Sequence, residues 1–407
     1  TLRALGDTAT VGGATIVAPV QRITVGGNLT LAGGASNATS YVEPTSGVKI
    51  AAGVLLGNLT AADVQIGVGG TFTMTPGSGN GGSVLLGAIN GGAGNAISVQ
   101  AANIAIGTTG VPSIAGIGSL DGTQATITLN DTGSGGEMLL DDRTRIAAGS
   151  GSVALRTTGG DGIHLAPNTR IFTRDLLVDS ADYFRLRGQI SATGDVTVAT
   201  GSYVWLDADR AGSATFLRAG GNMTLNTGGV AANDGGIYVQ NLGGTLAELS
   251  STGTMTIHLG GTASVLSVEA TGTAGGPALI KSGGNQTIDF TGAAGAPGKI
   301  LELLGGTGSA PAGASAMIET DGNQAILNSG GGTLAISLTG GATATTGRPE
   351  YLSATQICAT CSTQNNATLK AGGTQTFGSA AHPVTSVAGQ GGSNGVGNEA
   401  SIDAGGN

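Results

Sequence analysis

The sequence predicts an all-β fold, a parallel β-solenoid that repeats one short strand-forming unit along an elongated rod. Glycine makes up 78 of the 407 residues, and with the frequent β-branched residues it leaves no window of ~12 good helix formers. The predicted strands are too short to bury an apolar face alone, so they must stack on strands of the same kind. A five-residue motif, Gly-(Asn/Thr/Asp)-x-(Thr/Ala)-apolar, recurs at Gly27, Gly70, Gly194, Gly221, Gly253, Gly284, Gly322, Gly332 and Gly373.

Each copy of the motif is typical of a turn that leads into a strand. Glycine supplies the positive φ that a tight turn needs, Asn tolerates the left-handed region, and Thr and branched residues favour extended backbone. In Met223-Thr224-Leu225 and Met255-Thr256-Ile257 apolar and hydroxyl residues alternate. One face of each strand is therefore expected to point inward and the other outward.

Composition and charge exclude several classes of protein. The mean hydropathy is mildly positive and there is no Gly-x-y period, which argues against disorder and against collagen. The net charge is −9, and no basic run is present, so nucleic acid and anionic membranes are not expected partners. No apolar run approaches the ~20 residues that span a bilayer. No signal-peptide pattern is visible and Thr1 opens the chain, so we expect an interior or processed piece of a longer protein.

Residues 1–136 are predicted to be solenoid repeats with little else. Glycine, Asn, Ser or Pro bounds every apolar run in this part of the chain. Short alternating strands are expected at 23–31, 64–66, 72–74, 97–99, 104–106 and 126–129.

Residues 137–218 are predicted to be solenoid with a charged and aromatic surface. This stretch holds 19 of the 41 charged residues, and seven of the twelve aromatic residues lie in it or near it. We expect any binding face to lie here, with a Trp as a platform for sugar stacking. The candidate residues are Tyr183, Tyr203, Trp205, Asp207, Asp209 and Arg210.

The acidic residues of this stretch allow two further interpretations. Asp207 and Asp209 would share a strand face with Trp205, and such carboxylates could bind Ca²⁺ or act as an acid/base pair on a polysaccharide. However, ten acids and nine bases between 137 and 218 favour ladders of salt bridges between coils. We therefore assign no catalytic or metal-binding residue, and Ca²⁺ remains the one cofactor considered.

Residues 219–407 return to plain repeats. The motif glycines from Gly221 to Gly322 are separated by 32, 31 and 38 residues, and a gap of 51 then leads to Gly373. That gap contains a local excursion near 350–372 with the two cysteines, Cys358 and Cys361. No further zinc ligands or βαβ pattern accompany them, so we predict a local disulfide in an oxidising compartment. We expect 1–407 to form one continuous solenoid whose pattern continues beyond residue 407.

Several of these runs resemble a known family. Gly-Gly-Asn-Leu-Thr-Leu (26–31), Gly-Asp-Val-Thr-Val (194–198) and Gly-Asn-Gln-Thr-Ile (284–288) are similar to the repeat regions of filamentous-haemagglutinin-like exoproteins, the two-partner-secretion adhesins of Gram-negative bacteria. The resemblance implies a right-handed parallel β-helix, export through an outer-membrane pore and a role at the bacterial cell surface. The family's N-terminal secretion domain has no evident match in the chain.

The sequence thus favours a non-enzymatic, extracellular function. The first hypothesis is the repeat stalk of a secreted adhesin that presents the 137–238 face to glycans or a host surface. The second is a structural subunit of an extracellular fibre or biofilm matrix that self-associates end to end or laterally. The third is a polysaccharide lyase or hydrolase that uses Asp207 and Asp209. Seven Asn-x-Thr triplets are potential glycosylation sites, but Asn in a turn before a strand Thr explains them more simply.

Overall fold

The described part of the chain is all-β, which confirms the predicted fold class. In the computed structural model the strands pair in parallel, and the described residues contain no helix. No helix that could span a membrane is therefore found among them. The described residues are 2–3, 14–17, 20–33, 48–52, 63–78, 83–88, 95–111, 113–118, 125–134, 136–160, 162–228, 235–261, 263–270, 276–293, 298–306, 314–340, 365–390 and 399–406.

The chain divides into two compact units. Unit 1 comprises Thr1–Asp182 and Gly188–Gly194, and unit 2 comprises Tyr183–Arg187 and Asp195–Asn407. Both are parallel β-solenoids, and all of the predicted binding residues lie in unit 2.

The strands of unit 1 belong to two sheets. One contains β1 (Leu2–Arg3), β3 (Val20–Val25), β4 (Leu29–Ala32), β6 (Asp63–Thr75), β8 (Asn95–Ile106), β10 (Ala125–Asp131), β11 (Met138–Leu140), β13 (Ser152–Thr157), β14 (Ile163–Leu165) and β16 (Asp175–Ser180). The other contains β2 (Ala14–Val17), β5 (Val48–Ala52), β7 (Val84–Ala88), β9 (Ala115–Gly118), β12 (Thr144–Ala147), β15 (Arg170–Thr173) and β18 (Gln189–Ala192).

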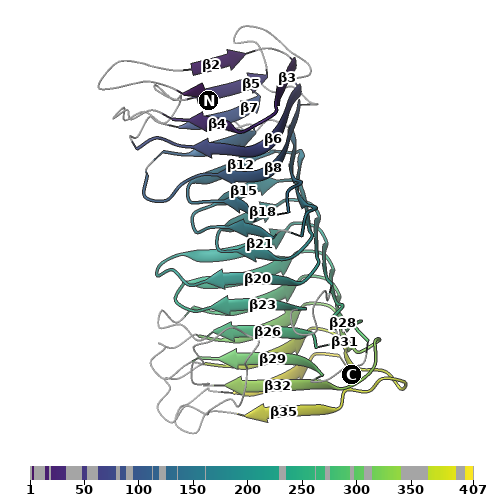
Figure 1. Cartoon of the computed structure of the whole chain (residues 1–407). Helices are drawn as coiled ribbons and strands as arrows, with labels where there is room; N and C mark the ends of the chain where they lie inside the picture. Colours follow the sequence, from purple (N-terminus) through teal and green to yellow (C-terminus); the bar gives the residue numbers. More distant parts are fainter. Residues whose placement is uncertain are drawn as a thin grey trace. The chain divides into compact units, whose positions relative to one another are not determined.

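Unit 2 is built from coils of three strands. After β17 (Phe184–Leu186), the first strands of successive coils are β19 (Val196–Thr200), β22 (Met223–Thr227), β25 (Met255–Leu259), β28 (Gln286–Phe290), β31 (Gln324–Leu327) and β34 (Gln375–Phe377). The second strands are β20 (Tyr203–Ala208), β23 (Gly236–Asn241), β26 (Val265–Ala270), β29 (Lys299–Gly305), β32 (Leu334–Gly340) and β35 (Ser386–Gln390). The third strands are β21 (Ala214–Ala219), β24 (Leu246–Ser251), β27 (Ala278–Ser282), β30 (Ala316–Thr320), β33 (Ala367–Ala371) and β36 (Ala400–Ala404). Figure 1 shows β20, β23, β26, β29, β32 and β35 side by side.

The core of unit 2 consists of rows of like residues. First strands such as β22 and β25 alternate buried and partly exposed positions, and their buried residues pair in register with their counterparts on the next coil. The row Leu225, Ile257, Ile288 and Ile326 is fully buried. Burial of apolar surface, at roughly 25 cal/mol per Å², stabilises such a stack, and no coil could obtain it alone.

The repeated motif forms a ladder of hydrogen bonds between coils. Asn222 Oδ1 accepts hydrogen bonds from the backbone N–H (3.0 Å) and the hydroxyl (2.9 Å) of Thr254, which holds the same motif position one coil further on. Asn323 accepts the same two bonds from Thr374, at 2.9 and 3.1 Å. A Cβ on Gly253 would lie 2.5 Å from Asn222 Oδ1. The motif therefore needs glycine because the Asn of the preceding coil fills that space.

This ladder also accounts for several of the Asn-x-Thr triplets. Asn28 Oδ1 accepts a hydrogen bond from the backbone N–H of Thr71, and Asn285 Oδ1 accepts one from Asn323, both at 2.9 Å. The triplet Asn side chains in these turns are held against the following coil. This geometry agrees with a structural role for these triplets.

Buried polar side chains extend the ladders into the core of unit 2. Gln324 Nε2 donates to Gln286 Oε1 at 2.7 Å, and Gln375 Nε2 donates to Gln324 Oε1 at 3.0 Å. Because each amide both donates and accepts, a buried Gln is satisfied only when the next coil is in register. The row of Gln side chains therefore favours one alignment of neighbouring coils among those in which the apolar residues could pack.

Candidate functional site

The candidate site is the outward side of β17 and of the second strands of unit 2, which we call the outer face. Its residues are Tyr183, Arg185, Arg187, Tyr203, Trp205, Asp207, Asp209, Tyr238, Gln240, Ser267, Glu269 and Glu302. Val204 and Leu206 of β20 are fully buried in the core, so the residues that alternate with them point to the opposite side. Parallel pairing in register then places Arg185, Trp205 and Tyr238 in one row across three coils.

Three tyrosines form an aromatic stack on this face. The rings of Tyr183 and Tyr203 are stacked, with centroids 5.2 Å apart and an interplanar angle of 6°. Tyr238 meets Tyr203 edge-on, at 6.4 Å and 66°. Its hydroxyl lies 2.8 Å from the place that a Cβ on Gly236 would occupy, so that glycine makes room for the ring. Tyr183 and Tyr203 remain half-buried, whereas Tyr238 is buried.

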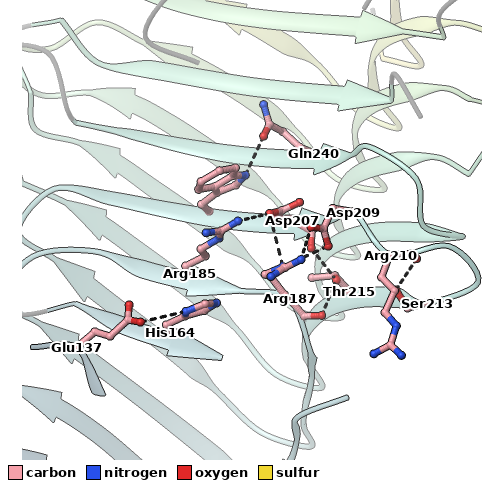
Figure 2. Close-up of polar contacts among 11 residues, drawn as sticks. Glu137, His164, Arg185, Arg187, Asp207, Asp209, Arg210, Ser213, Thr215 and Gln240 are labelled. Atoms are coloured by element: carbon pink, nitrogen blue, oxygen red, sulfur yellow. Dashed lines mark hydrogen bonds and ion pairs between the residues drawn. The ribbon is translucent and has the colours of Figure 1, made fainter. Parts of the chain in front are cut away.

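The indole ring of Trp205 makes contacts through one of its faces and through its edge. The Arg185 guanidinium lies 4.2 Å from the centroid of the indole ring, a cation–π contact. The indole Nε1 donates to Gln240 Oε1 at 2.8 Å, as Figure 2 shows. Sequence reasoning anticipated an open sugar platform at Trp205, but one ring face is covered by Arg185, which lies on the preceding coil of the stack.

The two predicted carboxylates are held by arginines. Asp207 Oδ2 accepts a hydrogen bond from Arg185 Nη2 at 2.6 Å and lies 3.8 Å from Arg187 Nε, while Arg187 pairs with both oxygens of Asp209 (Figure 2). Asp207 is 2% exposed, in contrast to the exposed carboxylate expected from the sequence. Burial raises the pKa of the Asp207 carboxyl, and the hydrogen bond from Arg185 opposes that rise.

This arrangement matches the ladder of salt bridges expected from the balanced charges. A guanidinium stands where a calcium ion at Asp207 and Asp209 would have to bind, and within the described residues no group of three or more His, Cys, Asp or Glu side chains is placed to hold a metal ion. Two paired carboxylates are also poorly suited to donate and accept protons in turn.

The remaining predicted residues are Arg210 and the two cysteines. Arg210 is exposed in the turn after β20, where its carbonyl oxygen accepts a hydrogen bond from Ser213 Oγ at 2.7 Å. Figure 2 shows its guanidinium directed away from Asp207. Cys358 and Cys361 lie outside the described residues, so the predicted disulfide stays a prediction.

Four polar residues of the outer face were not predicted from the sequence. Gln240 Nε2 donates to Glu269 Oε2 at 2.9 Å, and Ser267 and Glu302 are register partners of each other on β26 and β29. All four are buried. Burial and the charge of Glu269 raise the pKa of Glu302 to about 7. The available signal was the presence of Gln and Glu at outward strand positions, which a solvated surface would explain equally well.

Unit 1 contains a smaller polar cluster around the other acidic pair. Asn168 Nδ2 donates to Asp142 Oδ1 at 2.9 Å, and Arg145 Nη1 donates to the carbonyl oxygen of Asn168 at 2.9 Å. Asn168 has a φ of 63°, in the left-handed region that Asn tolerates. These contacts are those of a stacked turn, in which Asp142 fixes the turn on the next coil.

Comparisons with family models, with curated proteins and with solved structures found no match for the chain.

Proposed function

We propose that the chain is a non-enzymatic segment of a secreted bacterial surface adhesin, in which the solenoid is a scaffold and the outer face of unit 2 binds a glycan. The extracellular setting rests on the resemblance of the Gly-Asn repeats to filamentous-haemagglutinin-like proteins. The observation that carries the binding role is the half-exposed Tyr183–Tyr203 stack, with the Arg187–Asp209 ion pair further along the same face.

The chemistry of this patch suits a sugar ring. Aromatic rings pack against the C–H face of a pyranose. The carboxylate and guanidinium groups further along the face can exchange hydrogen bonds with the hydroxyls of another sugar of the same glycan. Rigid side chains lose little conformational entropy on binding, and the stacking of Tyr183 on Tyr203 restrains both rings. Trp205 and Asp207 have a supporting role, because their contacts with Arg185 hold the coil that carries Tyr183.

The polysaccharide-cleaving alternative receives less support. Asp207 is buried and hydrogen-bonded to Arg185, and Asp209 is paired with Arg187. Neither carboxylate is placed to protonate a leaving group. A binding protein needs no carboxylate that protonates a leaving group. The adhesin proposal is therefore consistent with two carboxylates that are both paired with arginines.

A glycan array with the purified chain tests the proposal. We expect saturable binding of a subset of glycans, and we expect Tyr203→Thr to weaken it at least about tenfold, since aromatic anchors commonly contribute 1 to 2 kcal/mol or more. Threonine favours the strand, so the fold should persist, as circular dichroism would verify.

Phe172→Thr supplies the matched control. Phe172 is an aromatic strand residue of unit 1 with 47% of its surface exposed, and its loss should leave binding unchanged. Equal loss of binding in both variants, or no binding by the wild-type chain, would remove the outer face as an adhesive site.

A further inference from the structure

Two carboxylates of the outer face are buried on adjacent coils. They lie on β26 and β29, the last strands along the chain that contribute residues to this face. Glu269 on β26 is 3% exposed and Glu302 on β29 is 6% exposed. Buried acidic side chains are normally paired with a cation or neutralised, because the desolvation of a charge is costly. Glu302 has no ion pair among the described residues, in contrast to Asp207 on the same face.

The strand register brings three oxygen-bearing side chains together. Ser267 and Glu269 are two residues apart on β26, so both point to the outward side of the sheet. Glu302 is the direct register partner of Ser267 on β29, one strand spacing away. Leu266, Val268, Leu301 and Leu303, which alternate with them, are fully buried in the core.

Two of these side chains have unused oxygen atoms. Ser267 is 0% exposed, and its Oγ is buried with no hydrogen-bond partner within the described part of the chain. The same holds for Glu302 Oε2. Unpartnered buried polar atoms are rare in folded proteins and call for a ligand, a water or an ion. Here a hydroxyl and a carboxylate from paired strands are unsatisfied at the same place.

The third side chain is held in position by its neighbours. Glu269 Oε2 accepts a hydrogen bond from Gln240 Nε2 at 2.9 Å, and Gln240 Oε1 accepts one from Trp205 Nε1 at 2.8 Å. This relay across three coils fixes the orientation of the Glu269 carboxylate. Such support for a ligating carboxylate is common around protein metal sites.

We propose that Ser267, Glu269 and Glu302 bind a hard divalent cation, with calcium preferred, which links the coils of β26 and β29. A divalent cation would neutralise both carboxylates and take up the unsatisfied oxygens. Calcium accepts carboxylate and neutral oxygen ligands in irregular geometry, whereas magnesium demands a near-ideal octahedron and gives up its waters reluctantly. The site is separate from Asp207 and Asp209, whose charges the arginines already balance.

Calorimetric titration of the full chain, stripped with a chelator at pH 8, tests the site directly. We expect one Ca²⁺ to bind per chain and the melting temperature to rise by several degrees on saturation, because a ligand that binds only the folded state stabilises it. Sodium chloride at matched ionic strength should have no such effect. Absence of both binding heat and melting shift in the folded wild-type chain would overturn the proposal, and would indicate that a shared proton neutralises the pair.

Three variants locate the cation. Glu302→Gln should abolish the calcium response, and Ser267→Ala, which removes only one neutral ligand, should weaken it. Glu319→Gln should leave it intact, since Glu319 pairs with Lys281 at 2.9 Å on β30. A calcium response that survives in Glu302→Gln would place the cation elsewhere and sink the assignment. Glycan binding is measured separately, so the two proposals can fail independently.

Discussion

At the scale of single residues, unit 2 shows that a buried charged group needs several hydrogen-bond partners. Lys299 is 2% exposed, and its ammonium donates to the carbonyl oxygen of Gly331 and to Asn328 Oδ1 at 2.8 Å and to the carbonyl oxygen of Phe290 at 3.3 Å. Burial lowers the pKa of Lys299, which the charge of Asp289 opposes. Three acceptors satisfy this ammonium, whereas in the described part of the chain Glu302 has no ion pair and its Oε2 has no hydrogen-bond partner. We therefore expect the stability of the protein to depend on pH through Glu302.

The stability of the chelated protein should therefore fall as pH rises. The pKa of Glu302 is raised from 4.5 to about 7, so the folded state binds a proton that the unfolded state releases. The resulting stabilisation is fully present below pH 4.5 and is lost as pH rises through about 7. Its upper limit is about 3 kcal/mol, at about 1.4 kcal/mol for each pKa unit.

Urea unfolding of the wild-type chain and of Glu302→Gln between pH 4.5 and 8, both with chelator, would measure this effect. The difference between their free energies of unfolding should change with pH in the stated direction. Glu269 is the charged neighbour that raises the pKa of Glu302, so the variant removes the titration of Glu302 and its coupling to Glu269 together. Parallel pH profiles for the two proteins would contradict the prediction.

At the scale of the structural element, the unit of construction is a motif turn together with the strand that follows it. The turn is specified by two residues on different coils, a glycine and the Asn that lies over it on the coil before. The strand is specified by alternation, which places Met223 and Leu225 in the core and Thr224 outside. Each element is thus local in sequence, but its turn is complete only when the previous coil is present.

A double-mutant cycle on Asn222 and Gly253 tests that coupling. Gly253→Ala alone should destabilise the chain, because its Cβ would meet Asn222 Oδ1 at 2.5 Å. Asn222→Ala alone should cost about 1 kcal/mol, since Thr254 loses two exposed hydrogen bonds that water partly replaces. Combined, the changes should be less harmful than their sum by about 1 kcal/mol, because the Asn that blocks the new methyl group is gone.

Asn226→Ala on the same strand is the matched control for the cycle. Asn226 is half-buried at an outward position two residues after Thr224 and lies outside the motif turn. It should change stability by less than about 0.5 kcal/mol, as ordinary surface substitutions do. Strict additivity of Asn222→Ala and Gly253→Ala would show that the ladder does not explain the motif glycine.

At the scale of the whole molecule, stability within a solenoid is shared only between neighbouring coils. In unit 2 the strands of the middle coils pair on both sides, for example β25 with β22 and β28. Among the described strands, β35 pairs with β32 alone and β36 with β33 alone, and all five residues of β35 are exposed. In such an array, local opening should be easiest in coils with one neighbour.

Hydrogen exchange should reveal this gradient. We expect amides of β25 and β28, which alternate buried and half-buried residues, to exchange at least about tenfold more slowly than those of β35 and β36. Mass spectrometry of peptic fragments would measure the rates. Uniform protection across these strands would mean that unit 2 opens as one cooperative block.

The sequence by itself determined the class of fold and the approximate positions of several strands. The fold class and the strand positions follow from local physics: alternation assigns each strand its inner and outer face, and a short strand has no stable alternative to stacking. It also identified Asp207, Asp209, Tyr183, Tyr203 and Trp205, because charge and aromatic residues are scarce elsewhere in the chain.

The expected strands 64–66 and 72–74 form the single strand β6, and 97–99 and 104–106 form the single strand β8. The expected positive φ of the motif glycines was wrong, since among the nine only Gly332 adopts it. At Gly253, Gly322 and Gly373 glycine is needed instead because a Cβ would meet the Asn side chain of the preceding coil.

Only the tertiary structure decided which outward residues meet and which become buried. Trp205 and Gln240 are 35 residues apart. The spacings from Gly221 through Gly253, Gly284 and Gly322 to Gly373 vary from 31 to 51 residues, so no fixed period pairs one coil with the next. Register depends on the long connections, and a shift of one residue would exchange the two faces of a strand. Burial on the outer face is likewise a property of the assembled coils, which is why Asp207 and Glu302 could not be recognised as buried from the sequence.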